Sequence, residues 1–142
     1  MTNYKLNIVI DTNVFVTALR SRRGASYKLL FEINRDKFRQ NISTSLIFEY
    51  ESAAKRETKL PKKQIDAILD TICQISRKSK IFFLWRPFLR DPKDDFILEL
   101  AIESESEYII TYNKKHFKNV EKFGIKLLDP KEFLEKIGEL KK

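Results

Sequence analysis

Short apolar runs alternate along the chain with longer segments whose apolar residues recur every three or four positions. Leu6–Ile10 reads Leu-Asn-Ile-Val-Ile, which is typical of a strand buried on both faces of a sheet. Ile65, Ile68, Leu69 and Ile72 have the spacing of an amphipathic helix. We predict strands at 6–10, 38–43, 81–85, 108–111 and 125–128, and helices at 12–19, 25–34, 46–56, 61–77, 91–105, 113–117 and 130–137.

This order of elements predicts an α/β fold, a three-layer α/β/α sandwich around a mostly parallel sheet. The 142 residues suffice for one sizeable core, so we expect a single domain over residues 1–142. No apolar run reaches the roughly 20 residues that span a bilayer. The N-terminus also lacks the features of a signal peptide. We therefore expect a soluble cytoplasmic protein with no membrane association.

Composition narrows the kinds of metal site that the chain can build. It contains one Cys and one His, which excludes a disulfide scaffold and any multi-cysteine or multi-histidine metal site. A metal ion would have to be held by oxygen ligands, which suit hard cations such as Mg²⁺ or Mn²⁺. The 28 Lys and Arg against 20 Asp and Glu give a net charge of +8, which is compatible with a nucleic-acid partner.

Acidic and amide side chains follow the predicted strands. Asp11 comes directly after the first strand, Glu49 lies early in a helix that follows a strand, and acids at 91–95 open a later helix. Thr111 is the last residue of the predicted strand at 108–111, and Asn113 follows it two positions later. The carboxyl ends of parallel strands form one edge, where ligands bind. Carboxylates gathered there repel one another unless a cation neutralises them, so this pattern favours metal-assisted phosphodiester hydrolysis.

Each acid also has a structural explanation. Asp11 and Asp91 are good helix N-caps, and capping alone would account for their positions. Asp94 shares a helix face with apolar residues four and seven positions later, which predicts an inward carboxylate. Asp95 shares its face with Glu99 and is expected to point outward.

The two glutamates of the helix at 46–56 are separated by the same argument. Glu49 lies on a partly apolar face with Leu46 and Ala53, whereas Glu51 has the i,i+4 spacing of a surface ion pair with Lys55. Glu49 is therefore expected to be the inward acid, and exposure of both glutamates is the alternative.

Taken in order, these segments resemble the PIN-domain family. Residues 8–16 read Ile-Val-Ile-Asp-Thr-Asn-Val-Phe-Val, like the first strand of the family and its Asp-Thr-Asn triplet. Glu49-Tyr50, the acids at 91–95 and the segment at 108–113 resemble the second, third and fourth motifs. Residues 127–134 resemble the end of the family's toxin-component subgroup. The resemblance covers nearly the whole chain.

The resemblance implies Mg²⁺- or Mn²⁺-dependent endoribonuclease activity, and many members of the family are VapC-like toxins of toxin–antitoxin pairs. It implies that Asp11, Glu49 and Asp94 are catalytic, metal-binding acids, with Asn113 as a further metal ligand. Many members have Asp at the position of Asn113, so this chain has one negative charge fewer there. The residues expected to orient the ligands are Asn13, Thr111 and Asp91.

The resemblance also implies an RNA substrate, a small antitoxin protein and a second copy of the chain as partners. The candidate contacts to RNA phosphates are Arg20, Arg22, Arg23, Lys114 and Lys115. A solvated basic surface is the alternative explanation for these residues. His116 has no partner in any motif and is expected to be a surface residue.

Two other functions fit parts of the sequence. A catalytically weak or inactive PIN-fold module for RNA binding or assembly fits Asn113 and the modest number of acids. It predicts RNA binding that EDTA leaves unchanged, and no product with any divalent ion. A phosphatase-like domain with Asp11 as nucleophile would need an acid where Asn13 stands, so we discount it.

Overall fold

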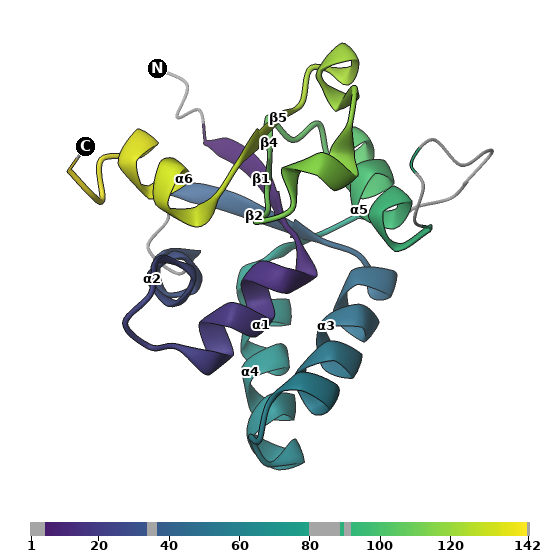
Figure 1. Cartoon of the computed structure of the whole chain (residues 1–142). Helices are drawn as coiled ribbons and strands as arrows, with labels where there is room; N and C mark the ends of the chain where they lie inside the picture. The colour runs from purple at the N-terminus through teal and green to yellow at the C-terminus, as the bar shows by residue number, and fades with distance from the viewer. Residues whose placement is uncertain (1–4, 34–36, 80–88, 90–91, 142) are drawn as a thin grey trace.

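The computed structural model describes residues 5–33, 37–79, 89 and 92–141 (Figure 1). Strands and helices alternate as the sequence predicts. The elements in chain order are β1 (Leu6–Ile10), α1 (Thr12–Arg20), α2 (Ala25–Glu32), β2 (Phe38–Ile42), α3 (Thr44–Glu57), α4 (Lys62–Ile75), β3 (Arg77–Lys78), α5 (Pro92–Glu103), β4 (Tyr108–Ile110), the 3₁₀ helices η2 (Lys114–Phe117) and η3 (Val120–Phe123), β5 (Lys126–Leu128) and α6 (Pro130–Lys136).

The described strands form a five-stranded parallel sheet in the order β3-β2-β1-β4-β5. Ile8 of β1 is paired with Gln40 of β2 on one side and with Tyr108 of β4 on the other. The chain thus builds outward from β1 first in one direction and then in the other. The point where the order reverses lies between β1 and β4, and this is where ligands bind in open parallel sheets.

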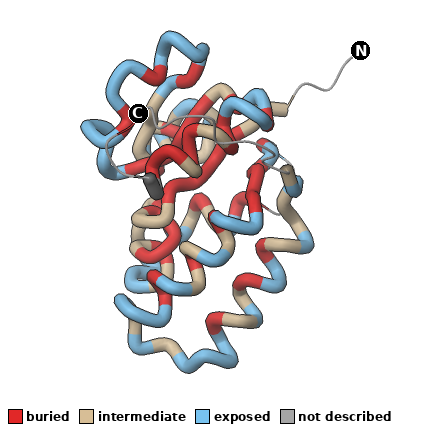
Figure 2. The backbone as a smooth tube through the Cα atoms, turned by 90° about the vertical axis from the view of Figure 1, so that its right-hand side faces the viewer, coloured by how far each residue is buried: buried red, intermediate tan, exposed pale blue. Residues whose placement is uncertain are grey.

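Alternate residues of β1 belong to two hydrophobic cores, one on each face of the sheet. Val9 packs in a core with Phe15 of α1 and with residues of α3, α4 and α5. Ile8 and Ile10 pack in the other core with Leu29 of α2 and Phe133 of α6. Helices therefore cover both faces, which confirms the predicted α/β/α sandwich. Figure 2 shows the buried residues gathered around the sheet, while the connection between α3 and α4 is exposed.

Tyr50 joins α3 to the end of β1. Its hydroxyl donates a hydrogen bond to the carbonyl oxygen of Ile10, and its ring stacks on Phe15, with ring centroids 4.4 Å apart. Burial, together with the nearby charge of Asp11, raises the pKa of Tyr50, so the phenol stays protonated and able to donate. These contacts fix α1 and α3 around the position where β1 ends.

The largest departure from the predicted elements is at the end of α4. The helix was predicted to continue to residue 77, but it ends at Ile75 because Ser76 adopts an extended conformation. Arg77 and Lys78 then form β3, pairing with the last two residues of β2. The predicted strand at 81–85 lies outside the described residues. None of the helices described is long and apolar enough to cross a lipid bilayer.

Candidate active site

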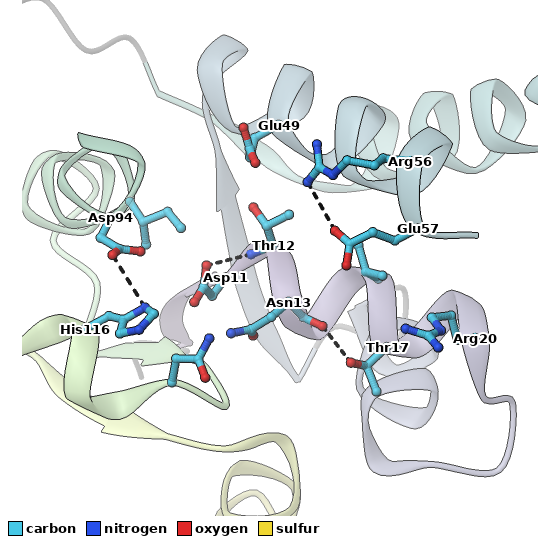
Figure 3. A pocket seen from close by; sticks show the side chains of 13 residues that line it. Asp11, Thr12, Asn13, Thr17, Arg20, Glu49, Arg56, Glu57, Asp94 and His116 are labelled. Atoms are coloured by element: carbon cyan, nitrogen blue, oxygen red, sulfur yellow. Dashed lines mark hydrogen bonds and ion pairs between the residues drawn. The ribbon is translucent and has the colours of Figure 1, made fainter. Parts of the chain in front are cut away.

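A pocket of about 260 Å³ opens where β1 and β4 end (Figure 3). Its walls come from α1, α3, the first two turns of α5 and the segment around η2. The polar side chains that line it include four acids, two arginines and one histidine. The lining residues are Asp11, Thr12, Asn13, Val16, Thr17, Arg20, Glu49, Arg56, Glu57, Asp94, Ile97, Asn113 and His116.

Asp11 lies at the base of this pocket as the N-cap of α1, and only 6 % of it is exposed. Its Oδ1 accepts a hydrogen bond from the Thr12 backbone N–H, and its Oδ2 accepts one from the Thr111 hydroxyl, each at 2.7 Å. Burial raises the pKa of Asp11, with a smaller contribution from Glu49, while the two hydrogen bonds and His116 act in the opposite direction. A cation would favour the charged carboxylate at this buried position.

Asp94 lies in the first turn of α5 and is 8 % exposed. This confirms that its carboxylate is buried, as the helix face predicted, and it lines the pocket. Its Oδ2 lies 3.6 Å from Nδ1 of His116. The side chain of His116 is 55 % exposed, which confirms the prediction of a surface residue, but its contact with Asp94 was not predicted. The sequence missed this contact because a single 3₁₀ turn has no periodicity that orients its side chains.

Glu49 is half-buried on α3 and lines the pocket. Ser43 caps this helix, because its Oγ accepts a hydrogen bond from the Leu46 N–H at 3.2 Å. Glu51 instead pairs with Lys55 at 3.1 Å on the outer face of the helix. The predicted positions of the two glutamates are therefore confirmed: Glu49 faces the pocket and Glu51 forms a surface ion pair.

Asp95 differs from its predicted position. It was expected to point outward, but it is 8 % exposed, and its Oδ1 accepts a hydrogen bond from the Leu89 N–H at 2.7 Å. The prediction was wrong because the helical spacing of α5 contains no information about Leu89, which donates this hydrogen bond. Asp91, the other acid proposed nearby, lies outside the described residues.

Hydrogen bonds link the ends of β1 and β4 beside Asp11. The Asn13 amide donates to Thr111 Oγ1 at 3.5 Å and accepts from the Tyr112 N–H at 3.4 Å. Thr111 Oγ1 also accepts from the Asn113 N–H at 2.9 Å. Thr111 therefore bonds to both Asp11 and Asn113, and Asn13 bonds to Thr111 and not directly to Asp11.

Two arginines reach the pocket. Arg20, at the end of α1, is one of the predicted RNA contacts, and Arg56 of α3 is an addition. Arg56 follows Glu49 by seven residues, or about two helical turns, so the helical repeat could have placed it on the same face. Arg56 pairs with Glu57 at 3.1 Å. The predicted RNA contacts that lie outside the lining are Arg22, Arg23, Lys114 and Lys115, and Lys114 pairs with Glu132 at 2.6 Å.

The oxygen ligands of the pocket fit a hydrated hard cation. Within the described part of the chain, no three His, Cys, Asp or Glu side chains form a ready-made group for a metal ion. Mg²⁺, however, is usually bound through one or two carboxylates and keeps several of its waters. Asp11, Asp94 and Asn113 line the same pocket, whose volume of about 260 Å³ leaves room for such waters.

Comparison with known proteins identifies the fold and the family of the chain. No curated protein sequence matches the chain. Among solved structures, the fold is similar to a chain in the crystal structure of VapBC2 from Rickettsia felis bound to a DNA fragment from their promoter. That match has a TM-score of 0.62 and 17 % identity, and it covers 87 % of this chain and 98 % of the other. A family model for the PIN domain matches residues 7–115. The chain therefore belongs to the PIN-domain family, as the order of its motifs predicted.

Proposed function

We propose that this protein is a Mg²⁺- or Mn²⁺-dependent endoribonuclease that hydrolyses RNA phosphodiester bonds. The observation that carries the proposal is that Asp11, Glu49 and Asp94, which come from three distant segments, line one pocket. Carboxylates that share one pocket repel one another, and a bound cation would offset this cost. Membership of the PIN-domain family supports nuclease chemistry at this pocket.

The residues that would hold the ion are Asp11, Glu49 and Asp94, with Asn113 beside them. A bound divalent ion supplies polarisation of a phosphoryl oxygen and activation of water. Asp11 keeps its orientation through the hydrogen bonds from Thr111 and Thr12. The side chains thus bring fixed negative charge to the place where the ion and the reacting phosphate would meet.

The two ends of the pocket differ in charge, which supports a polyanionic substrate. Figure 3 shows Asp94 and His116 toward one end, Arg20 and the Arg56–Glu57 ion pair toward the other, and Asp11 and Glu49 between them. A strand with one phosphate beside the acids would present a neighbouring phosphate to the guanidinium groups, which bind phosphate well. Outside the pocket, Arg22, Arg23, Lys114 and Lys115 are further candidate contacts to the backbone.

We also propose that the protein is the toxin of a toxin–antitoxin pair, because its motifs resemble that subgroup of the family. A small antitoxin would bind over the acidic pocket or in a neighbouring apolar groove of about 310 Å³ between α1, α2 and α4. Tyr27 and Phe31 of α2 line this groove and are exposed. A second copy of the chain is the alternative occupant of the groove.

The second candidate function is an RNA-binding module without catalysis. Two observations favour it: Asn113 stands where many family members have Asp, and the acids of the described residues form no ready-made metal group. In that case Arg20 and Arg56 would bind RNA while the acids would serve the fold alone.

Incubation of the purified protein with single-stranded and with structured RNA distinguishes the two functions. We expect cleavage products with Mg²⁺ or Mn²⁺ and none with EDTA, because the carboxylates cannot activate water unaided. RNA binding that EDTA leaves unchanged, with no product under any divalent ion, would instead support the binding module.

A further inference from the structure

Thr12 has an unsatisfied group inside the pocket. It is the first residue of α1, and its backbone N–H donates to Asp11. Its hydroxyl oxygen is one of the few buried side-chain atoms, among the residues described, that have no hydrogen-bond partner. Buried polar atoms are nearly always paired, and an unpaired one costs free energy. The Thr12 hydroxyl can therefore donate a hydrogen bond to a side chain that comes within reach.

The nearest candidate partner is Glu49. Figure 3 shows the Thr12 hydroxyl and the Glu49 carboxylate pointing toward one another from α1 and α3, across the pocket that both residues line. The helices themselves are fixed, because Tyr50 of α3 bonds to Ile10 and stacks on Phe15 of α1. Approach of the two groups thus depends on rotation of the Glu49 side chain, which is half-buried.

Electrostatic repulsion explains why Glu49 does not already lie against Asp11. Both are carboxylates that line the same pocket, and placing like charges side by side costs free energy. Closer approach of the two carboxylates would increase this cost unless a cation lay between them. Within the described segments, no three His, Cys, Asp or Glu side chains are grouped so that they could hold a metal ion. This agrees with Glu49 and Asp11 lying apart in the metal-free protein.

We propose that Thr12 is a positioning residue for Glu49. Once a divalent cation offsets the repulsion, Glu49 turns toward Asp11 and the Thr12 hydroxyl donates a hydrogen bond to its carboxylate. This inference rests on the proposed function, because it requires a cation at the acids. Thr12 contacts neither the ion nor the RNA, and it acts only through Glu49.

Two substitutions at Thr12 test this role by isothermal titration with Mn²⁺ in the absence of RNA. Thr12→Val keeps the shape and a similar helix propensity but removes the hydroxyl, whereas Thr12→Ser keeps the hydroxyl. We expect about 10- to 100-fold weaker Mn²⁺ binding for the Val variant, the range seen when a partner of a metal ligand is lost, and nearly unchanged binding for the Ser variant. The metal-free Val variant should melt at the same temperature as the wild type or higher.

A double-mutant cycle with Glu49→Gln completes the test. Thr12→Val should have little further effect in that background, because both residues act through one interaction. If Thr12→Val binds Mn²⁺ as tightly as the wild type does, the proposed role of Thr12 is overturned but the metal site stands. Absence of Mn²⁺ binding by the wild type overturns both proposals. A lower melting temperature of the metal-free Val variant, restored by Ser, assigns the hydroxyl to the fold and also overturns the inference.

Discussion

Asp11→Asn is expected to lower the rate of RNA cleavage by at least about 10³-fold, as removal of one member of a catalytic group that acts as a unit does. Asn has the shape of Asp but lacks its charge, and the charge is what the buried position offers to a cation. The variant should remain folded, because Asn is a good N-cap and its side-chain oxygen can still accept the hydrogen bond from the Thr12 N–H.

The pKa of Asp11 gives the direction of the stability change. Burial raises this pKa in the folded state, so the folded protein binds the proton more tightly than the unfolded chain does. Ionisation of Asp11 therefore costs stability as the pH rises through its folded pKa. Neutral Asn removes that cost, so the free energy of unfolding should not fall in the metal-free variant.

Asp70→Asn is the matched control for this experiment. It makes the same chemical change on an exposed position of α4 that does not line the pocket. Gel assays of RNA cleavage and thermal melting should show Asp70→Asn active and folded, and Asp11→Asn inactive and folded. Full activity of purified Asp11→Asn would remove Asp11 from the catalytic group.

Phe15→Ala should lower the free energy of unfolding by about 3–5 kcal/mol. Phe15 is fully buried and stacks on Tyr50 with an angle of 12° between the ring planes, in the core shared by α1, β1 and α3. Domains are typically stable by only about 5–15 kcal/mol, so the variant would lose much of its stability. Because Phe15 supports the helix that begins at Asp11, activity should fall together with the folded fraction.

Urea unfolding of Phe15→Ala and of Phe48→Ala measures this effect. Phe48 is also on the α1–α3 side of the sheet, in α3, but it is 64 % exposed, so its truncation should change the free energy of unfolding by less than about 0.5 kcal/mol. Equal losses for the two variants would contradict the packing described around Phe15.

The sheet and the positions of its main acids follow from short-range patterns. β1 ends in three consecutive β-branched residues, Ile8, Val9 and Ile10, and Asp11 follows them directly. The burial of these three residues and the place of Asp11 at the edge of the sheet could therefore be predicted. Thr111 lies 100 residues later, but the rule that parallel strands share one carboxyl edge brings it to Asp11. The hydrogen bond between them is a consequence of the order of strands.

Other features depend on contacts that no local pattern records. Arg77 and Lys78 are both exposed, so no apolar signal marks β3. Asp95 is buried and accepts a hydrogen bond from the Leu89 N–H. A helical wheel of α5 contains no information about Leu89, so this contact could not be predicted. His116 meets Asp94 only because η2 and α5 pack side by side.

The most direct test of the account is a crystal structure of the protein grown with Mn²⁺ and measured at the Mn²⁺ absorption edge. We expect anomalous density for a Mn²⁺ ion inside the pocket. Carboxylate oxygens of Asp11 and Asp94 should coordinate this ion, and the Glu49 side chain should be turned toward it. Anomalous density only at other residues, or none in the pocket at a Mn²⁺ concentration that supports RNA cleavage, would contradict the account.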